Sequence, residues 1–106
     1  MVRVLINVPK QIVAGQPFDV KMLISHPMES GQRRDQVGHA IRRDIINHFV
    51  CTLDGETVLD ADFFPAIAAN PFLSFSVVAE KSGTLALTFT DDHGVTQTEL
   101  VAITVA

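Results

Sequence analysis

The chain of 106 residues has a single cysteine, Cys51, and no tryptophan. One cysteine excludes an internal disulfide framework and any zinc site built from several cysteines. No apolar run approaches the roughly 20 residues that a membrane-spanning helix needs, so no membrane segment is expected. The sequence also lacks a glycine-rich phosphate cradle, an internal repeat and a low-complexity tract.

Basic residues are scarce as well. Eight Lys and Arg stand against twelve Asp and Glu, which gives a net charge of -4. A nucleic-acid binder normally needs a basic face to neutralise phosphates, so nucleic acid is not an expected partner. A hydrophobic fraction of 47% predicts a folded chain. The length fits one domain, residues 1–106.

Apolar and polar residues alternate with period two in several short segments, which is the pattern of half-buried β-strands. Such segments are residues 2–8, 17–25, 49–53, 85–90 and 101–105, and a further strand begins after Pro71. Asp54-Gly55 and Asp92-His93-Gly94 are typical hairpin turns. A helical turn is predicted between Pro65 and Pro71.

About seven strands without a convincing helix predict an all-β fold, an immunoglobulin-like antiparallel β-sandwich. The buried tryptophan and paired cysteines of antibody domains are absent, so this likeness concerns the architecture only.

Residues 26–44 are the one long segment without alternation, and they open with His26-Pro27-Met28-Glu29-Ser30-Gly31. Long irregular segments in compact domains tend to be functional or disordered. Four arginines and three carboxylates give this segment a net charge of +1 and leave -5 for the rest of the chain: Arg33, Arg34, Arg42 and Arg43 against Glu29, Asp35 and Asp44. It is therefore the first place to look for function.

The histidine and sulfur residues allow a metal hypothesis, because His26, Met28 and Cys51 would suit a soft ion such as Cu(I). The other histidines show no ligand-type spacing. The simpler interpretation makes His26 a hydrogen-bonded residue at a strand end and Met28 an apolar contact. Cys51 shares a strand face with Phe49, so we expect it in the core with a raised pKa.

Carboxylate pairs do not indicate acid–base catalysis. Asp60 and Asp62 fall on one strand face, which their apolar neighbours mark as the solvated one. Asp91 and Asp92 lie in a predicted turn. We therefore expect no catalytic residue, no cofactor site and no metal site.

The segment Asn70-Pro71-Phe72-Leu73-Ser74-Phe75 carries apolar side chains for both faces of a strand. Pro71 moves Asn70 out of the α region and starts the strand. One face can serve the core, whereas the other would be exposed, which favours a protein interface.

Two motifs in this order, His26–Gly31 followed by arginines and then Asn70–Phe75, resemble the SoxZ family. SoxZ is the non-carrier subunit of the SoxYZ sulfur-carrier complex of thiosulfate oxidation. The likeness runs from Ala14-Gly15-Gln16-Pro17-Phe18 to the Asp92–Gly94 turn, and Ser30 stands where the family usually has threonine.

The resemblance implies an immunoglobulin-like scaffold that is not an enzyme and forms a heterodimer with SoxY. SoxY carries sulfur intermediates on a cysteine in its glycine-rich tail, whereas this chain ends Ala102-Ile103-Thr104-Val105-Ala106. It also implies a periplasmic location, reached by co-export with a signal-bearing SoxY, and transient contacts with other Sox enzymes. The isolated chain is expected to be capable of forming a homodimer, and an intersubunit disulfide is the alternative role for Cys51.

Partner binding is predicted at both motifs and at the first arginine pair. In this interpretation Pro27 directs the chain, Gly31 permits a turn and Met28 offers an adaptable apolar contact. The predicted residues are His26, Pro27, Met28, Gly31, Arg33, Arg34, Asn70, Pro71 and Phe72. Two alternatives stay open, a stand-alone periplasmic β-sandwich binding module and a small copper-binding protein.

Overall fold

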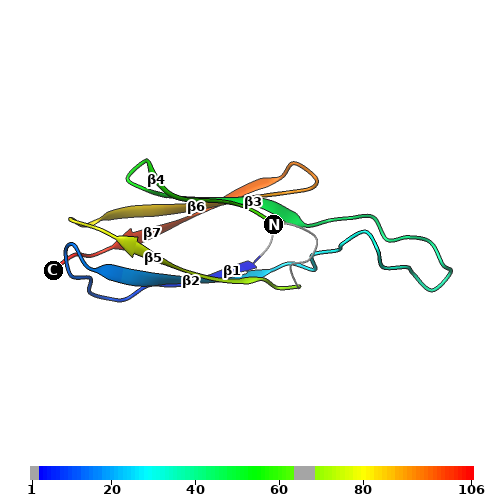
Figure 1. Cartoon of the computed structure of the whole chain (residues 1–106), viewed down its shortest axis with the longest axis horizontal. Coiled ribbons are helices and arrows are strands. Elements are labelled where there is room, and N and C mark those ends of the chain that lie inside the picture. Colours follow the sequence, from blue (N-terminus) through cyan, green and yellow to red (C-terminus); the bar gives the residue numbers. More distant parts are fainter. Residues whose placement is uncertain (1–2, 64–68) are drawn as a thin grey trace.

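Two antiparallel sheets face each other in a computed structural model, which describes residues 3–63 and 69–106 (Figure 1). One sheet has the order β1-β2-β5: β1 (Arg3–Asn7), β2 (Pro17–Ser25) and β5 (Phe72–Val78). The other has the order β4-β3-β6-β7: β4 (Glu56–Asp62), β3 (Ile46–Leu53), β6 (Gly83–Asp91) and β7 (Thr96–Ile103). The predicted all-β sandwich of seven strands is confirmed. No described helix is long and apolar enough to span a membrane.

The core lies between the sheets because alternate residues of each strand point inward. In β2 the inward residues are Phe18, Val20, Met22 and Ile24, all buried. The rings of Phe49 and Phe75 meet edge to face across the two layers, with centroids 5.9 Å apart. Each large apolar side chain buried here contributes about 1.5–3 kcal/mol to stability.

Both predicted hairpin turns are confirmed. Asp54 and Gly55 connect β3 to β4 with φ angles of 49° and 87°, the left-handed pair that a tight two-residue hairpin requires. Gly94, with φ 77°, closes the turn between β6 and β7, where its N–H donates to Asp91 O at 3.0 Å.

Two strands are longer than the alternation predicts. β3 starts at Ile46 and β7 at Thr96, several residues before the predicted starts. In β7 the half-buried positions include Gln97 and Glu99, so polar side chains hide the alternation at this sheet edge. The helical turn predicted over residues 66–70 falls largely on residues 64–68, which lie outside the described residues.

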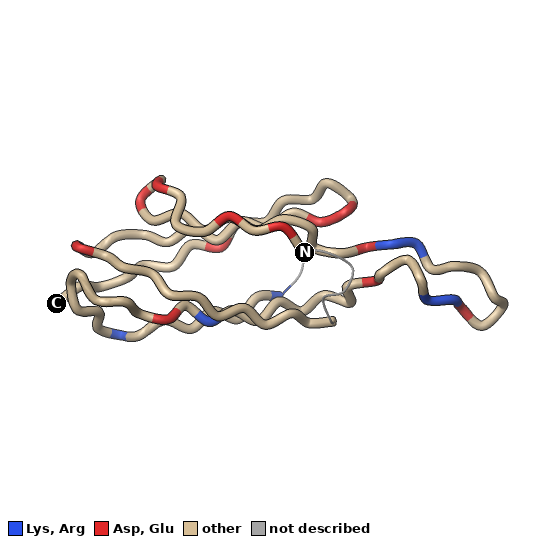
Figure 2. Tube along the Cα trace, viewed as in Figure 1, with Lys and Arg blue, Asp and Glu red and all other residues tan. Residues whose placement is uncertain are grey.

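Residues 29–44 form a two-stranded arm that projects from one end of the sandwich (Figures 1 and 2). Glu29 and Asp44 pair through two backbone hydrogen bonds of 2.9 and 2.8 Å, and Arg34 lies opposite Ala40. With the arm the molecule measures 57 × 20 × 20 Å. The segment is therefore a paired hairpin and not the irregular loop that we expected. Both faces of a free-standing arm meet water, so no alternation marks it in the sequence.

Candidate protein-docking surface

The two motifs meet at the base of the arm, although 44 residues separate them. The His26 N–H donates to Asn70 Oδ1 at 3.0 Å, and the Asn70 N–H donates to His26 O at 2.7 Å. Asn70 has φ 52°, a left-handed conformation that asparagine tolerates better than most residues. Asn70 therefore clamps the point at which the chain leaves β2 and enters the arm.

His26 and Met28 are buried, with 4% and 5% of their surface exposed. The Met28 N–H donates to His26 Nδ1 at 3.0 Å, and Met28 Sδ accepts the Ile46 N–H at 3.3 Å. This confirms a hydrogen-bonded histidine at the strand end. The Met28 side chain belongs to the core, as the simpler interpretation of an apolar contact expects, and its contact with a partner stays a prediction.

The other predicted residues divide between the surface and the interior. Pro27, Asn70 and Phe72 are exposed, whereas Pro71 is buried. Gly31 is half-buried with φ 89°, and a Cβ there would lie 3.2 Å from the Cβ of Arg43 on the other leg of the arm. Pro71 and Gly31 thus shape the backbone, and their contact with a partner stays a prediction.

Two of the four arm arginines are neutralised by carboxylates. Arg33 forms a bidentate pair with Glu29, and this hydrogen-bonded contact is the main reason that the pKa of Arg33 is raised and that of Glu29 lowered. Arg43 forms a second bidentate pair, with Asp92, at 2.8 and 2.9 Å. The hydrogen bond from Arg43 is the main reason that the pKa of Asp92 lies well below its ordinary range.

The uncompensated positive charge lies elsewhere on the arm. Arg34 donates to the carbonyl oxygen of Gly38 at 2.7 Å, and among the described residues neither Arg34 nor Arg42 forms an ion pair. Both side chains are exposed. The sequence pointed to Arg33 and Arg34, but the structure leaves Arg34 and Arg42 as the free charges.

An apolar row crosses the outer face of the three-stranded sheet. Leu5 in β1 lies opposite Leu23 in β2, which lies opposite Phe72 in β5. These three residues, which we call the apolar row, are 57, 38 and 61% exposed. Shallow hollows of about 350 and 280 Å³ flank them, and Arg3, Asn70 and Lys21 help to line the hollows.

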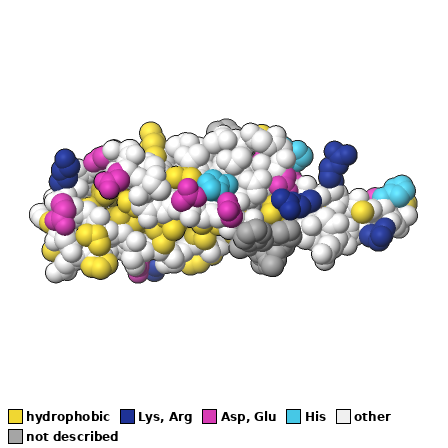
Figure 3. All heavy atoms as spheres, turned by 45° about the horizontal axis from the view of Figure 1, so that its top comes forward, with side chains coloured by type: hydrophobic (Ala, Val, Ile, Leu, Met, Phe, Trp, Pro, Cys, Tyr) yellow, Lys and Arg dark blue, Asp and Glu magenta, His cyan; other side chains and the backbone are white. Residues whose placement is uncertain are grey.

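The outer face of the four-stranded sheet is polar by comparison. Threonine hydroxyls pair across its strands, Thr88 with Thr98 at 2.9 Å, while both ring nitrogens of His48 contact carboxylates. Leu100, 70% exposed there, lies opposite Ala86. Figure 3 shows acidic and histidine side chains beside hydrophobic ones over the body, and Lys and Arg both on the arm and at the opposite end of the body. The apolar row is thus the better candidate for a lasting protein contact.

Sequence reasoning missed Leu5 and Leu23. Leu23 occupies a solvent-facing position beside Asp19, Lys21 and Ser25 in β2, and this irregularity was the available signal. Strand register alone aligns Leu23 with Leu5 and Phe72.

Comparison with known families decides the relationship. The model described as "Sulphur oxidation protein SoxZ" matches residues 6–102. The chain belongs to the SoxZ family. Membership confirms the resemblance read from the two motifs, and it supports a role in sulfur oxidation. A search of curated proteins finds no match.

Solved structures share the fold of this SoxZ-family chain. A superoxide reductase (neelaredoxin) from Ignicoccus hospitalis has a TM-score of 0.73 at 20% identity, covering 99% of this chain and 82% of that one. A putative superoxide reductase from Thermotoga maritima has a TM-score of 0.72 at 14% sequence identity, and the match covers 97% of this chain and 85% of that one. The sulfur carrier protein SoxY from Chlorobium limicola f thiosulfatophilum has a TM-score of 0.68 at 14% sequence identity, and the match covers 97% of this chain and 78% of that one. At these identities the likeness shows the fold alone.

Proposed function

We propose that this chain is the non-catalytic scaffold subunit of a sulfur-carrier heterodimer in which a SoxY-like partner holds the carrier cysteine. Membership of the SoxZ family supports the pathway. The observation that carries the pairing is the apolar row, which leaves three large side chains in water on one sheet face. Burial of such a patch against a partner would remove this exposed apolar surface.

The cysteine of this chain is poorly suited to carry sulfur itself. Cys51 is fully buried, and burial raises the pKa of its thiol to about 11. A thiol in that state is almost entirely protonated at neutral pH, and the thiolate is the reactive form. Its burial also argues against an intersubunit disulfide. The carrier cysteine therefore belongs on the partner.

The apolar row has the anatomy of a protein interface. Phe72 provides an aromatic anchor beside two leucines, and the polar or charged residues Arg3, Asn70 and Lys21 form a rim. We assign the lasting pairing to this face. We assign transient contacts with Sox enzymes to the arm, where charge is exposed and apolar surface is small.

The proposed location is the periplasm, with export in company of a signal-bearing partner. Cell fractionation in the presence and absence of the SoxY-like gene would test it. We expect the chain in the periplasmic fraction only when the partner is present, and export without the partner would contradict this route.

The pairing is tested by co-expression with a SoxY-like protein, followed by size-exclusion chromatography with light scattering. We expect a stable one-to-one complex. Phe72→Glu should weaken it at least about a hundredfold, because a charge would be buried in an apolar contact. Leu100→Glu is the matched control, since Leu100 is 70% exposed on the opposite face. A chain that stays monomeric beside the partner would favour a stand-alone binding module instead.

A further inference from the structure

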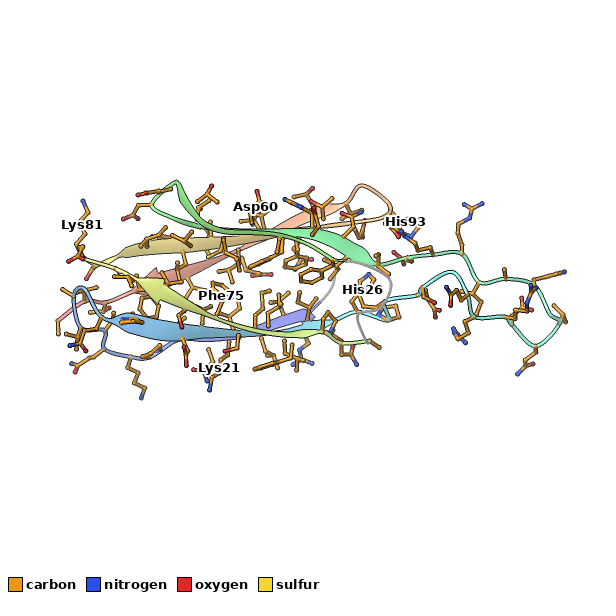
Figure 4. The ribbon with its side chains drawn as sticks, viewed as in Figure 1. Lys21, His26, Asp60, Phe75, Lys81 and His93 are labelled. Carbon is orange, nitrogen blue, oxygen red and sulfur yellow. The ribbon has the colours of Figure 1, made fainter. Side chains whose placement is uncertain are left out.

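Three side chains that can bind a metal gather where the arm meets the sandwich, and a fourth, His93, lies beside one of them, Asp44. His26 lies just beyond the end of β2 and Asp44 ends the arm. Asp91 is the last residue of β6, and His93 lies in the turn that follows. One ligand atom from each of His26, Asp44 and Asp91 lies within 4.8 Å of the others. Figure 4 places His26 and His93 at this same end of the molecule.

The Asp44 carboxylate has an oxygen atom that no hydrogen bond from the described residues satisfies, as expected of a side chain that binds an ion. Asp44 Oδ1 is buried, and no described residue donates a hydrogen bond to it. His93 Nε2 lies 3.3 Å from this oxygen and His26 Nε2 lies 3.8 Å from it. Donor atoms around a tetrahedral zinc ion are about 3.3 Å apart, as bond lengths of about 2.0–2.1 Å require. The His93–Asp44 spacing thus equals that of ligands sharing one ion, whereas the His26–Asp44 spacing is wider, and Asp91 lies within 4.8 Å, so an ion must draw these groups inward.

We propose that His26, His93, Asp44 and Asp91 form a binding site for a divalent zinc-like ion. Two imidazole nitrogens and two carboxylates make a mixed N/O set that suits Zn²⁺. The set contains no sulfur, which separates it from the Cu(I) site considered for His26, Met28 and Cys51. In the Cu(I) set, Met28 Sδ already accepts a hydrogen bond from the Ile46 N–H, so it is not free to bind an ion.

The turn that bears Asp91 is already ordered. Asp91 Oδ1 accepts the N–H groups of His93 and Val95 at 2.9 and 3.0 Å, which holds the carboxylate in place before any ion binds. Such hydrogen bonds orient a metal-binding carboxylate and limit the ordering that binding requires.

One contact must change when the ion binds. His26 Nδ1 accepts the Met28 N–H, so in the neutral ring the proton resides on Nε2. Binding through Nε2 requires the proton to move to Nδ1, and the Met28 hydrogen bond must then break. Loss of one such bond lowers affinity roughly tenfold, which a four-ligand site can tolerate.

The ion would join three separate segments: the end of β2, the base of the arm and the β6–β7 turn. The base of the arm and the β6–β7 turn are already joined by several contacts of Asp92, which include the Arg43–Asp92 pair, the Asp92 N–H bond to Ile45 O at 2.9 Å and the Asn47 bond to Asp92 Oδ1 at 3.0 Å. Bound zinc should therefore fix the direction of the arm. Zinc should raise the melting temperature and slow proteolytic cleavage at the base of the arm.

Titration calorimetry with ZnCl₂ on the metal-stripped full chain tests the site, with Co²⁺ absorption as a second readout. We expect one ion per chain and a tetrahedral Co²⁺ spectrum. Asp44→Asn and His93→Gln should each weaken zinc binding at least about tenfold. These positions are partly or largely exposed, so the variants should fold where a His26 variant could fail.

His48→Gln is the matched control. His48 also touches two carboxylates, Asp60 and Asp62, but each of its ring nitrogens meets a different one at 3.0 or 2.7 Å. Zinc binding should be unchanged in this variant. Absence of stoichiometric binding at roughly 100-fold excess zinc, or binding that survives both Asp44→Asn and His93→Gln, would overturn the site. The apolar row takes no part, so this result is independent of pairing with SoxY.

Discussion

At the residue scale, Met28 belongs to the His26–Gly31 motif, which was predicted to start a docking loop, yet its side chain lies in the core. Its φ of 51° is unfavourable for a residue with a Cβ, at a cost of about 1–2 kcal/mol. The conformation turns its N–H toward His26 Nδ1 and its sulfur toward the Ile46 N–H. These contacts and the burial of the side chain offset the backbone cost and fix the start of the arm.

Burial of Cys51 predicts a loss of stability at alkaline pH. Its pKa rises from the ordinary 9.0 to about 11 in the folded chain because burial disfavours the thiolate. This contribution is fully present below pH 9 and is lost as the pH rises through about 11. The loss approaches about 2 kcal/mol. Urea unfolding at several pH values should show this loss of unfolding free energy. In Cys51→Ala the free energy of unfolding should fall less steeply over the same alkaline range. Equal slopes for the two proteins would contradict the prediction.

Asp92 predicts the opposite dependence at acid pH. Arg43 holds its pKa well below the ordinary 3.8, so its contribution is fully present above that value and declines as pH falls through the lower folded pKa. Asp92→Asn should destabilise the chain at neutral pH, by no more than about 1 kcal/mol because water screens this exposed ion pair with Arg43.

The same chemical unfolding experiment, repeated toward strongly acidic pH, checks the Asp92 prediction. The difference between Asp92→Asn and the parent chain should shrink as the parent's Asp92 begins to gain a proton. Asp62→Asn, at an exposed carboxylate on β4, is the control and should change stability little. A constant difference across the pH range would show that charge is not the cause.

At the scale of elements, the arm differs from the strands in what holds it together. Its backbone pairs at Glu29–Asp44 and Arg34–Ala40, and its tip is closed by Asp35, whose Oδ1 accepts the N–H groups of Val37 and His39. Almost none of this depends on buried apolar surface. Substitutions of exposed side chains on the arm should therefore leave the core undisturbed.

The free arginines predict a salt-dependent association that belongs to the arm. The double substitution Arg34→Ala and Arg42→Ala should slow the association of the assembled complex with a Sox enzyme about tenfold at low salt, and less near physiological salt. Stopped-flow measurements at several ionic strengths would show this. Arg33→Ala is the control, because Glu29 already neutralises Arg33. If Arg33→Ala slowed association as much as the double substitution does, the unpaired charges of Arg34 and Arg42 would not be the cause.

At the scale of the whole molecule, charge and apolar surface are separated. The arm, residues 29–44, carries four arginines and three carboxylates, a net +1, and the remainder of the chain carries -5. Figure 2 shows the positive residues concentrated on the arm and acidic ones over the body. The apolar row lies on the body, on the outer face of β1-β2-β5. The exposed arginines and the exposed apolar row thus lie in two separate places.

The uncovered apolar row predicts self-association of the isolated chain. We expect light scattering to show a dimer that forms as concentration rises and disappears on addition of the SoxY-like partner, because both compete for one face. Phe72→Glu should abolish the dimer, whereas Leu100→Glu should leave it. A dimer that persists in Phe72→Glu would place self-association elsewhere.

Much of the fold was predictable from local pattern. Alternation identified β2 from Pro17 to Ser25, and the Asp54-Gly55 pair identified a hairpin, because both signals arise from neighbouring residues. The two SoxZ motifs were also visible in the sequence. Their contact was not, since the His26–Asn70 hydrogen bonds join residues 44 apart.

The sequence by itself determined the all-β class, the family and a buried Cys51, since alternation, motif order and apolar neighbours are local properties. Tertiary structure alone decided that Leu5, Leu23 and Phe72 form one row, that Met28 turns inward and that Arg34 and Arg42 stay free of the ion pairs that neutralise Arg33 and Arg43. The reason is physical. Strand register and the approach of distant segments decide which side chains share a surface, and neither is encoded in the spacing of neighbours.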